Sequence, residues 1–230
     1  MLATKGMRFP IDVILVCIRW YAAYPLSYRH LEEMMKERGV FVDHSSINRW
    51  AIRFLPLLEK VFRKHKRPVS DSWRMDETYI KVKGAWKYLY RAVDKEGKTV
   101  DFLLTAKRNK VAALRFFEKA MKASGVPEKV TMDKSGANKA AMDEINASRQ
   151  TPIVVRQVKY LNNIVEQDHR AIKRVTRPML NFKSFRAARN VLAGIELMHM
   201  IRKGQLVLQG STALSFADQF YALAGKIRPV

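Results

Sequence analysis

The stretch of sequence that decides the fold lies at residues 73–82 and reads WRMDETYIKV. In its first half, Trp73, Met75 and Glu77 alternate with Arg74, Asp76 and Thr78. Tyr79, Ile80 and Val82 continue the strand. A period of two residues predicts a β-strand, because successive side chains of a strand point to opposite faces of the sheet. We therefore expect a strand that carries two adjacent acids, Asp76 and Glu77, one toward each face.

The residues that follow extend this strand into a mixed α/β domain. Residues 86–93 are rich in aromatic side chains and predict a second strand, and residues 99–105 predict a third. An amphipathic helix is expected over 109–123, followed by a short strand at 129–132 that stops at Asp133. Three antiparallel strands, a helix, a fourth strand and further helices follow the element order of an RNase H-like α/β domain.

Candidate catalytic carboxylates occur at the three places where such a domain positions them. Asp76 lies in the first strand, Asp133 ends the fourth, and Glu166 lies near the start of the next long helix, expected over 162–177. Phosphodiester chemistry must stabilise charge on the attacking and the leaving oxygen, and two Mg²⁺ (or Mn²⁺) ions about 4 Å apart can do this. Because hard cations take oxygen ligands, two Asp and one Glu from separate elements suit such a pair of ions.

These acids have alternative interpretations. Glu77 follows Asp76 but points to the opposite face of the strand, and it could be the ligand instead. Glu166 could belong to an ion-paired helix surface, because bases share its helix face. The basic residues of that helix are Arg170, Lys173, Arg174 and Arg177, of which the first, second and fourth share the face of Glu166. On the functional interpretation, these bases hold a nucleic-acid backbone.

The chain lacks the residue patterns that other classes of catalytic site need. The five histidines show no zinc-binding spacing, and neither a Gly-rich phosphate loop nor a serine-hydrolase elbow occurs. The single cysteine, Cys17, excludes a disulfide framework and favours a reducing compartment. No apolar run reaches the about 18 residues of a membrane span, and the N-terminus shows no signal-peptide pattern. We therefore expect a cytoplasmic, nucleoid-associated protein with no membrane partner.

The charge of the chain indicates its partner. The 230 residues carry 43 Lys and Arg against 21 Asp and Glu, which gives a formal net charge of +22 and a pI near 10.3. The net charge is +7 over residues 1–68, +6 over 69–150 and +9 over 151–230. Because every segment is positive, we expect an extended polyanion such as DNA as the partner. The alternative is a basic protein that its charge keeps in solution.

Helical periodicity dominates the N-terminal part of the chain. A first helix is expected to end before Pro25, and Ser27 is expected to cap a helix over 28–38. After a short turn, Asp43 or Ser45 is expected to cap a third helix. Two helices joined in this way form a helix-turn-helix pattern, although an ordinary three-helix bundle would show the same periodicity.

In a helix-turn-helix domain, the start of the third helix enters the major groove of DNA. The candidate base and phosphate contacts are therefore His44, Ser45, Ser46, Asn48 and Arg49. A charged linker at 64–68 follows and predicts a domain boundary. The expected organisation is a helix-turn-helix domain at 1–68, an RNase H-like catalytic domain at 69–205 and a C-terminal tail at 206–230.

Several stretches together carry the pattern of one protein family. The most specific reads KYLNNIVEQDHRAIKR at residues 159–174. The others lie at 27–34, 42–50, 73–82, 86–94, 131–134, 182–185 and 194–196. Over nearly its whole length, the chain resembles the DDE transposases of the insertion-sequence-six family.

The resemblance implies roles for particular residues. The acids of the family align with Asp76, Asp133 and Glu166, which favours Asp76 over Glu77, and its basic residue seven positions after the Glu aligns with Lys173. The resemblance also implies a replicative, cointegrate-forming outcome. Two departures concern the connection after Asp133: its interval to Glu166 holds 32 residues, fewer than expected, and no aromatic residue occurs at 135–138.

Three functions compete at this stage. The leading hypothesis is a transposase that binds the inverted repeats of an insertion sequence, frees a 3′-OH by hydrolysis and joins it to target DNA. The alternatives are a sequence-specific DNA-binding protein with an inactive nuclease-like domain and a structure-selective nuclease of the same fold. Because a transposase of this kind acts on two ends together, we expect a homodimer or a higher homo-oligomer.

Overall fold

The computed structural model describes residues 8–207 and 214–226 and divides into two compact units. One unit is Pro68–Ala171, and the other combines Met1–Arg67 with Ile172–Val230. The chain after Ile172 thus shares a unit with the N-terminal helices, whereas the expected domain boundaries at 68 and 205 stay predictions. The C-terminal tail expected at 206–230 lies partly outside the described residues, and its described part contains a helix.

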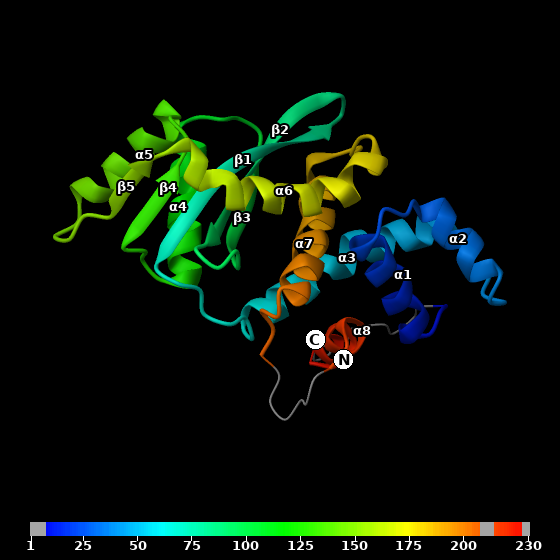
Figure 1. Ribbon diagram of the computed structural model, residues 1–230. Coiled ribbons are helices and arrows are strands. Elements are labelled where there is room, and N and C mark those ends of the chain that lie inside the picture. Colours follow the sequence, from blue (N-terminus) through cyan, green and yellow to red (C-terminus); the bar gives the residue numbers. More distant parts are fainter. Residues whose placement is uncertain (1–7, 208–213, 227–230) are drawn as a thin grey trace. The chain divides into compact units, whose positions relative to one another are not determined.

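The unit Pro68–Ala171 is built on a five-stranded sheet in the order β3-β2-β1-β4-β5 (Figure 1). Strands β1, β2 and β3 are antiparallel, and β4 and β5 run parallel to β1. This is the RNase H-like arrangement predicted from the element order. The strands are β1 (Ser72–Val82), β2 (Ala85–Asp94), β3 (Thr99–Thr105), β4 (Lys129–Met132) and β5 (Val154–Gln157).

One face of this sheet forms the hydrophobic core of the unit with two helices, α4 (Lys110–Ser124) and α5 (Gly136–Ala147). Trp73 and Met75 of β1 are buried against this core together with Phe116 of α4. Full burial of side chains of this size contributes about 1.5–3 kcal/mol each. Because alternate residues of β1 enter this core, Arg74 and Asp76 point to the opposite face.

Helix α6 (Asn163–Thr176) crosses the opposite face of the sheet (Figure 1). Its residues Asp168 and His169 reach side chains of β1 and β2. A short 3₁₀ helix, η1 (Lys159–Asn162), precedes α6, and another, η2 (Arg177–Met179), follows it.

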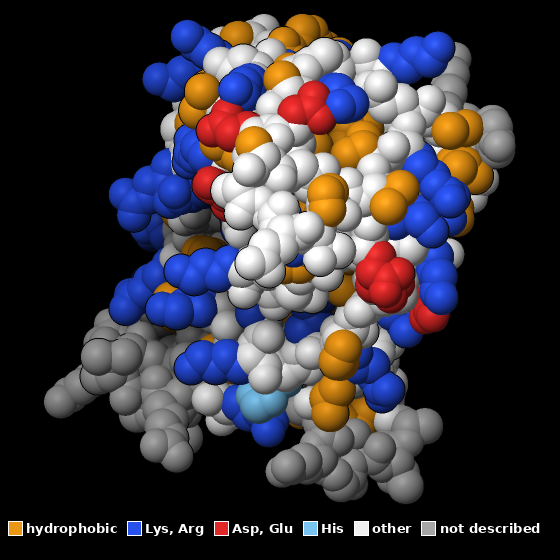
Figure 2. Space-filling model, turned by 90° about the vertical axis from the view of Figure 1, so that its left-hand side faces the viewer, with side chains coloured by type: hydrophobic (Ala, Val, Ile, Leu, Met, Phe, Trp, Pro, Cys, Tyr) orange, Lys and Arg blue, Asp and Glu red, His pale blue; other side chains and the backbone are white. Residues whose placement is uncertain are grey.

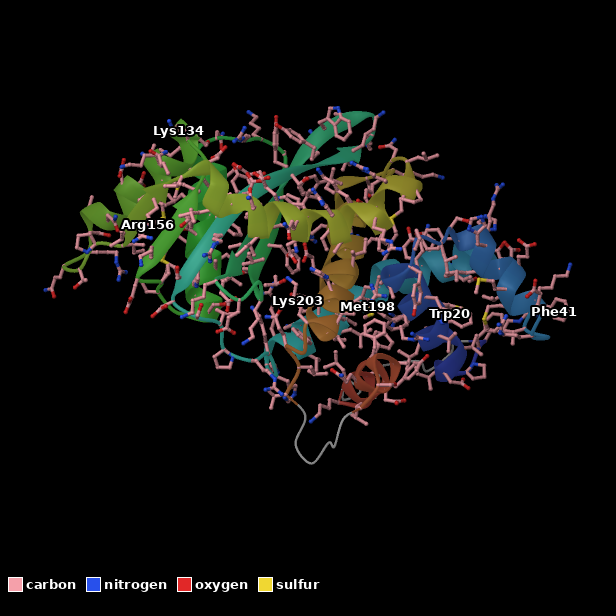
Figure 3. The ribbon with its side chains drawn as sticks, viewed as in Figure 1. Trp20, Phe41, Lys134, Arg156, Met198 and Lys203 are labelled. Carbon is pink, nitrogen blue, oxygen red and sulfur yellow. The ribbon has the colours of Figure 1, made fainter. Side chains whose placement is uncertain are left out.

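Within the described residues, five α-helices lie wholly in the second unit: α1 (Ile11–Ala23), α2 (Tyr28–Lys36), α3 (His44–Arg63), α7 (Phe185–Arg202) and α8 (Phe216–Gly225). Helix α3 packs against α1, α2 and α7. Met198 lies on α7, and Lys203 directly follows its end (Figure 3). No helix in the described ranges is both long enough and apolar enough to cross a membrane.

The helix starts of this unit follow their capping residues. Ser27 accepts a hydrogen bond from the backbone N–H of His30 at 3.1 Å, which confirms the expected cap of α2. Asp43, rather than Ser45, is the N-cap of α3. Pro56 lies inside α3, which continues to Arg63.

Gly194 marks the closest approach between α7 and α3. A Cβ atom at this position would lie 2.5 Å from Cδ1 and 2.8 Å from Cγ of Leu55. The Gly194→Ala variant should therefore lower the free energy of unfolding by about 1–3 kcal/mol, as overpacked cores do, although alanine is otherwise the better helix former. Gly136→Ala is the control, because nothing lies within 4 Å of that Cβ position. Denaturant unfolding of both variants checks this, and an unchanged Gly194→Ala protein would contradict the packing.

Candidate active site

Strand register brings Asp76 and Asp133 together. Strand β4 runs parallel to β1 with Thr131 opposite Arg74. Asp76 lies two residues beyond Arg74, and Asp133 lies two residues beyond Thr131. Asp76, inside β1, and Asp133, directly after the end of β4, therefore reach the same level of the sheet, as the element order predicted.

A third carboxylate joins them. Asp76, Glu77 and Asp133 each offer an oxygen, and these three oxygens lie within 4.8 Å of one another. The β1–β4 pairing ends at Arg74, and beyond it the Glu77 carboxylate lies close to Asp133 although Glu77 and Asp76 alternate along the strand. We call these three residues the carboxylate group. Glu166 of α6 is exposed and is not among the acids of this group.

Arg108 and Asn138 hold two members of the carboxylate group. Arg108 donates from Nε to Glu77 Oε1 at 3.2 Å and from Nη2 to Asp133 Oδ2 at 3.0 Å. Asn138, which is buried, donates from Nδ2 to Glu77 Oε1 at 3.1 Å and to Asp133 Oδ1 at 3.4 Å. These donors offset repulsion between carboxylates that lie so close together.

Glu77 is the most deeply placed of the three acids, with 3% of its side chain exposed against 36% for Asp133. Burial raises the pKa of Glu77 above its ordinary value, and the Arg108 guanidinium and the Asn138 amide act in the opposite direction. A carboxyl with a raised pKa holds its proton more readily, so cations must compete with protons at this residue.

Asp76 is oriented by His169 of α6, on the sheet face opposite to the core. The sequence did not identify His169 as a site residue. Arg91 Nη1 lies 3.3 Å from His169 Nδ1, and His169 Nε2 lies 3.2 Å from Asp76 Oδ2. Because a guanidinium only donates hydrogen bonds, Nδ1 must accept, and the ring proton of a neutral His169 then resides on Nε2. His169 therefore donates to Asp76.

Asp168 completes this chain of contacts. Arg91 donates from Nη2 to Asp168 Oδ2 at 2.7 Å, and the Arg91 side chain is fully buried. Arg91 lies directly opposite Asp76 in the β1–β2 register. The only sequence signal for this arrangement was the pair Asp168-His169 within the motif at 159–174.

The carboxylate group fits a divalent cation. Its ligand atoms are all carboxylate oxygens, which Mg²⁺ and Mn²⁺ prefer. Ligand distances of about 2.0–2.1 Å around Mg²⁺ place neighbouring ligand oxygens within the spacing observed here. A carboxylate has about four acceptor sites, so contacts from Arg108 and a metal ion can coexist on the same side chain.

The bases expected to contact nucleic acid are mostly at the surface. Arg170 and Arg174 of α6 and Arg177 of η2 are exposed, and Lys173 is half-buried. Lys173 lies seven residues after Glu166 on the same helix, close to two turns further on. Their contacts to a nucleic-acid backbone stay a prediction.

Basic side chains also lie near the carboxyl ends of β4 and β5. Lys134 comes directly after Asp133 and Arg156 lies on β5, and both are exposed (Figure 3). Lys and Arg side chains are spread over the face shown in Figure 2, with fewer acidic side chains among them. This distribution agrees with the positive charge found in each segment of the sequence.

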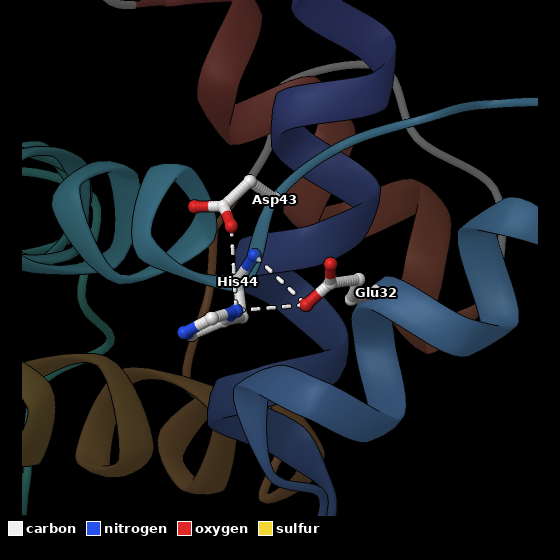
Figure 4. Close-up of side chains that lie close together, drawn as sticks. All are labelled: Glu32, Asp43 and His44. Atoms are coloured by element: carbon white, nitrogen blue, oxygen red, sulfur yellow. Dashed lines mark hydrogen bonds and ion pairs between the residues drawn. The ribbon is translucent and has the colours of Figure 1, made fainter.

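The start of α3 is held by a second acidic network (Figure 4). Glu32 of α2 accepts hydrogen bonds from the His44 backbone N–H at 3.2 Å and from His44 Nδ1 at 2.8 Å. Asp43 accepts from the Ser45 backbone N–H at 2.8 Å. The hydrogen bonds from the side chain and backbone of Ser45 lower the pKa of Asp43. The side chains of Glu32, Asp43 and His44 thus fix the start of α3.

The other candidate DNA contacts lie on the first turns of α3. Ser45 and Arg49 are exposed, and Arg49 donates from Nη2 to Ser46 Oγ at 2.8 Å. Asn48 is half-buried. Phe41 is 74% exposed in the turn ahead of the helix (Figure 3). The two helices and their turn are present as predicted, and their binding to DNA stays a prediction.

Comparison with known proteins gives consistent matches. A family model described as a DDE domain matches residues 70–205. The transposase for insertion sequence-like element IS431mec of Staphylococcus aureus (strain Mu50 / ATCC 700699) is 42% identical over 198 residues, which cover 85% of this chain and 87% of that protein. The transposase for insertion sequence element IS257 in transposon Tn4003 of Staphylococcus aureus has the same identity and coverage.

Solved structures also match. The HTLV-2 integrase catalytic core domain in complex with magnesium (trimeric form) has a TM-score of 0.46 and 17% identity, over 58% of this chain and 88% of that chain. The catalytic core domain of BIV integrase has a TM-score of 0.35 and 11% identity, over 70% of this chain and 87% of that chain.

Proposed function

We propose roles for the residues of this chain from the family to which it belongs. It is a member of the insertion-sequence-six family of DDE transposases, metal-dependent enzymes that cleave and transfer DNA strands. Asp76, Asp133 and Glu166 hold the metal, and the N-terminal helices bind the inverted repeats of the element. The enzyme hydrolyses one strand at each end and joins the freed 3′-OH to target DNA.

The observation that carries this proposal is the carboxylate group, in which Asp76 and Glu77 lie within β1 and Asp133 directly follows β4. Three carboxylate oxygens within 4.8 Å of one another, held by Arg108 and Asn138, form a ready ligand environment for hard cations. We propose two Mg²⁺ ions (or Mn²⁺), which stabilise charge on the attacking and leaving oxygens when bound. Asp76 and Asp133 provide ligands from the sheet, and Glu166 provides one from α6.

The residues of the chain around these acids position them. His169 donates to Asp76 and fixes the plane of its carboxylate, and Arg91 fixes the tautomer of His169. Arg108 keeps Glu77 and Asp133 together. Arg170, Lys173, Arg174 and Arg177 contact the phosphates of the DNA strand, and the resemblance to the family gives Lys173 a phosphate near the reacting bond.

One assay separates the competing functions. The full chain is incubated with duplex DNA of the element ends, a target plasmid and Mg²⁺ or Mn²⁺, and the products are resolved on a gel. Joined strands support the transposase. Binding without cleavage would indicate a DNA-binding protein with an inactive catalytic domain, and cleavage of branched DNA without joining would indicate a structure-selective nuclease.

We assign sequence recognition to the first turns of α3. His44, Ser45, Ser46, Asn48 and Arg49 would face the major groove, and the Glu32–His44 contacts would fix the angle at which α3 enters it. Exposed Arg49 is the strongest candidate for a base contact, because arginine pairs with two acceptors of guanine.

The Arg49→Ala variant should weaken binding of end DNA by about 1–3 kcal/mol while changing affinity for random DNA far less. The physical reason is that a base contact discriminates between sequences, whereas a phosphate contact does not. Fluorescence anisotropy with both DNAs checks this. Arg115→Ala, at an exposed position on α4, is the control. Equal losses on both DNAs would reduce Arg49 to a phosphate contact.

Assembly follows from the reaction. Two ends must be joined to one target, so we propose that the active form is a homodimer or a higher homo-oligomer. Sedimentation of the protein with and without end DNA tests this.

A further inference from the structure

The β1–β2 hairpin carries exposed aromatic side chains on the sheet face that Trp73 and Met75 share, whereas a solvated strand face usually carries polar ones. Tyr79 is 49% exposed and Trp86 is 59% exposed. The Tyr79 ring centroid lies 6.3 Å from that of Trp86 and 5.5 Å from that of Tyr88. The three rings therefore form one continuous patch, and continuous exposed apolar patches mark interaction sites, whereas isolated residues do not.

Lysines are interleaved with these rings. Lys81 Nζ lies 5.9 Å from the centroid of the Trp86 ring. Lys83 at the turn adds another positive charge, and no acid occurs anywhere between Thr78 and Val93 in the sequence. Rings that stack with bases, next to amines that pair with phosphates, form the chemical pattern of a single-stranded nucleic-acid surface.

The patch leads to the carboxylate group. Side chains alternate along β1, so Tyr79 and Lys81 share the face of Glu77. Tyr79 lies two residues from Glu77, which corresponds to about 7 Å along a strand. On β2, Tyr88 lies opposite Tyr79, and Trp86 lies opposite Lys81 further from the acids.

The hairpin holds these rings in a defined place. Lys83 and Gly84 have positive φ values of 50° and 77°, as a two-residue type I′ turn requires. On the opposite face, Ile80 and Val82 are buried, with 3% exposed. The rings are thus presented on an anchored ribbon, so little side-chain freedom remains to be lost when a ligand stacks on them.

We propose that this patch, formed by Tyr79, Lys81, Trp86 and Tyr88, binds unpaired bases of the DNA strand whose backbone lies at the carboxylate group. The inference rests on the proposed function, because it takes DNA as the substrate. Stacking does not read sequence, since every base has a flat face. The patch therefore holds a strand end open next to the acids, while sequence is read elsewhere in the chain.

The test uses the full chain and fluorescence anisotropy with two labelled probes. One is a blunt duplex of about 20 base pairs, and the other is the same duplex with about six unpaired thymidines, within the length of a single-strand site. The Tyr79→Ala/Trp86→Ala double variant should bind the tailed probe about tenfold more weakly and the blunt probe within twofold of wild type. Trp86→Phe, which keeps a ring, should retain most of the affinity for the tail.

Val126→Ala is the matched control, because Val126 is also 49% exposed, and it should bind both probes normally. Unaltered melting temperatures show that the exposed substitutions leave the fold intact. Equal affinity of the double variant and wild type for the tailed probe would overturn the inference. So would loss of self-association in the double variant, since the patch would then pair two copies of the chain. If the double variant shows either of these results while the wild-type protein still joins strands, the inference fails but the proposed function stands.

Discussion

Asp76→Asn should reduce strand joining by about a thousandfold or more while leaving binding of end DNA within about twofold of wild type. A bound metal ion contributes several kcal/mol of transition-state stabilisation, and each 1.36 kcal/mol corresponds to a tenfold change in rate. The substitution removes the charge of a ligand but keeps its size, so DNA contacts elsewhere should persist. Strand-transfer rate and end-DNA affinity, measured on one preparation, check both parts.

Two further variants sharpen this prediction. Asp143→Asn is the control, because Asp143 is exposed and forms an ion pair with Lys139 one turn earlier on α5. Glu77→Gln keeps an oxygen that accepts from Arg108 and Asn138, and it should lose less activity than Asp76→Asn. The reverse order would make Glu77 the principal ligand of β1, which is the alternative that the sequence left open.

Arg91→Met should lower the free energy of unfolding by about 3–5 kcal/mol, the range found when one partner of a buried ion pair is removed. Methionine fills similar space, but the Asp168 carboxylate would lose its 2.7 Å contact and His169 Nδ1 its donor. Strand joining should also fall, because His169 would no longer be held with its Nε2 proton toward Asp76. Denaturant unfolding and the strand-transfer assay measure the two effects.

The exposed Arg115 on α4 provides the matched control for this substitution, and Arg115→Met should stay within about 0.5 kcal/mol of wild type. Adding Asp168→Leu to Arg91→Met should restore part of the stability, because it removes the unpartnered charge. A loss below 1 kcal/mol in the single variant would contradict the structural role of this pair.

Much of the sheet was predictable because its strands differ in periodicity from the helices. The expected strands at 99–105 and 129–132 are confirmed to the residue. Strand β5 was missed, because four residues at a sheet edge, none of them buried, give no periodic signal. Helix α8 was also missed, since the sequence after 205 was interpreted as a tail.

The site was predictable only in part. Asp76 and Asp133 could be placed because the strands that precede or contain them are visible in the sequence, and parallel register then brings the two acids together. The partners Arg108, Asn138 and His169 could not be found, because their contacts depend on tertiary packing between distant segments. Sequence alternation placed Glu77 on the opposite face from Asp76, but it could not show that both acids approach Asp133.

The parallel pairing of β4 with β5 bears on how much the chain between Asp133 and Glu166 can change in length. Met132 lies opposite Gln157, so the segment leading to α6 is fixed to the sheet nine residues before Glu166. Helix α5 and the connection at residues 148–153 lie between the two pinned strands. Residues gained or lost in that connection would leave both strand ends where they are. We therefore expect a change in the length of this connection to leave the catalytic acids in place, and the same connection is where a peptide tag could be inserted.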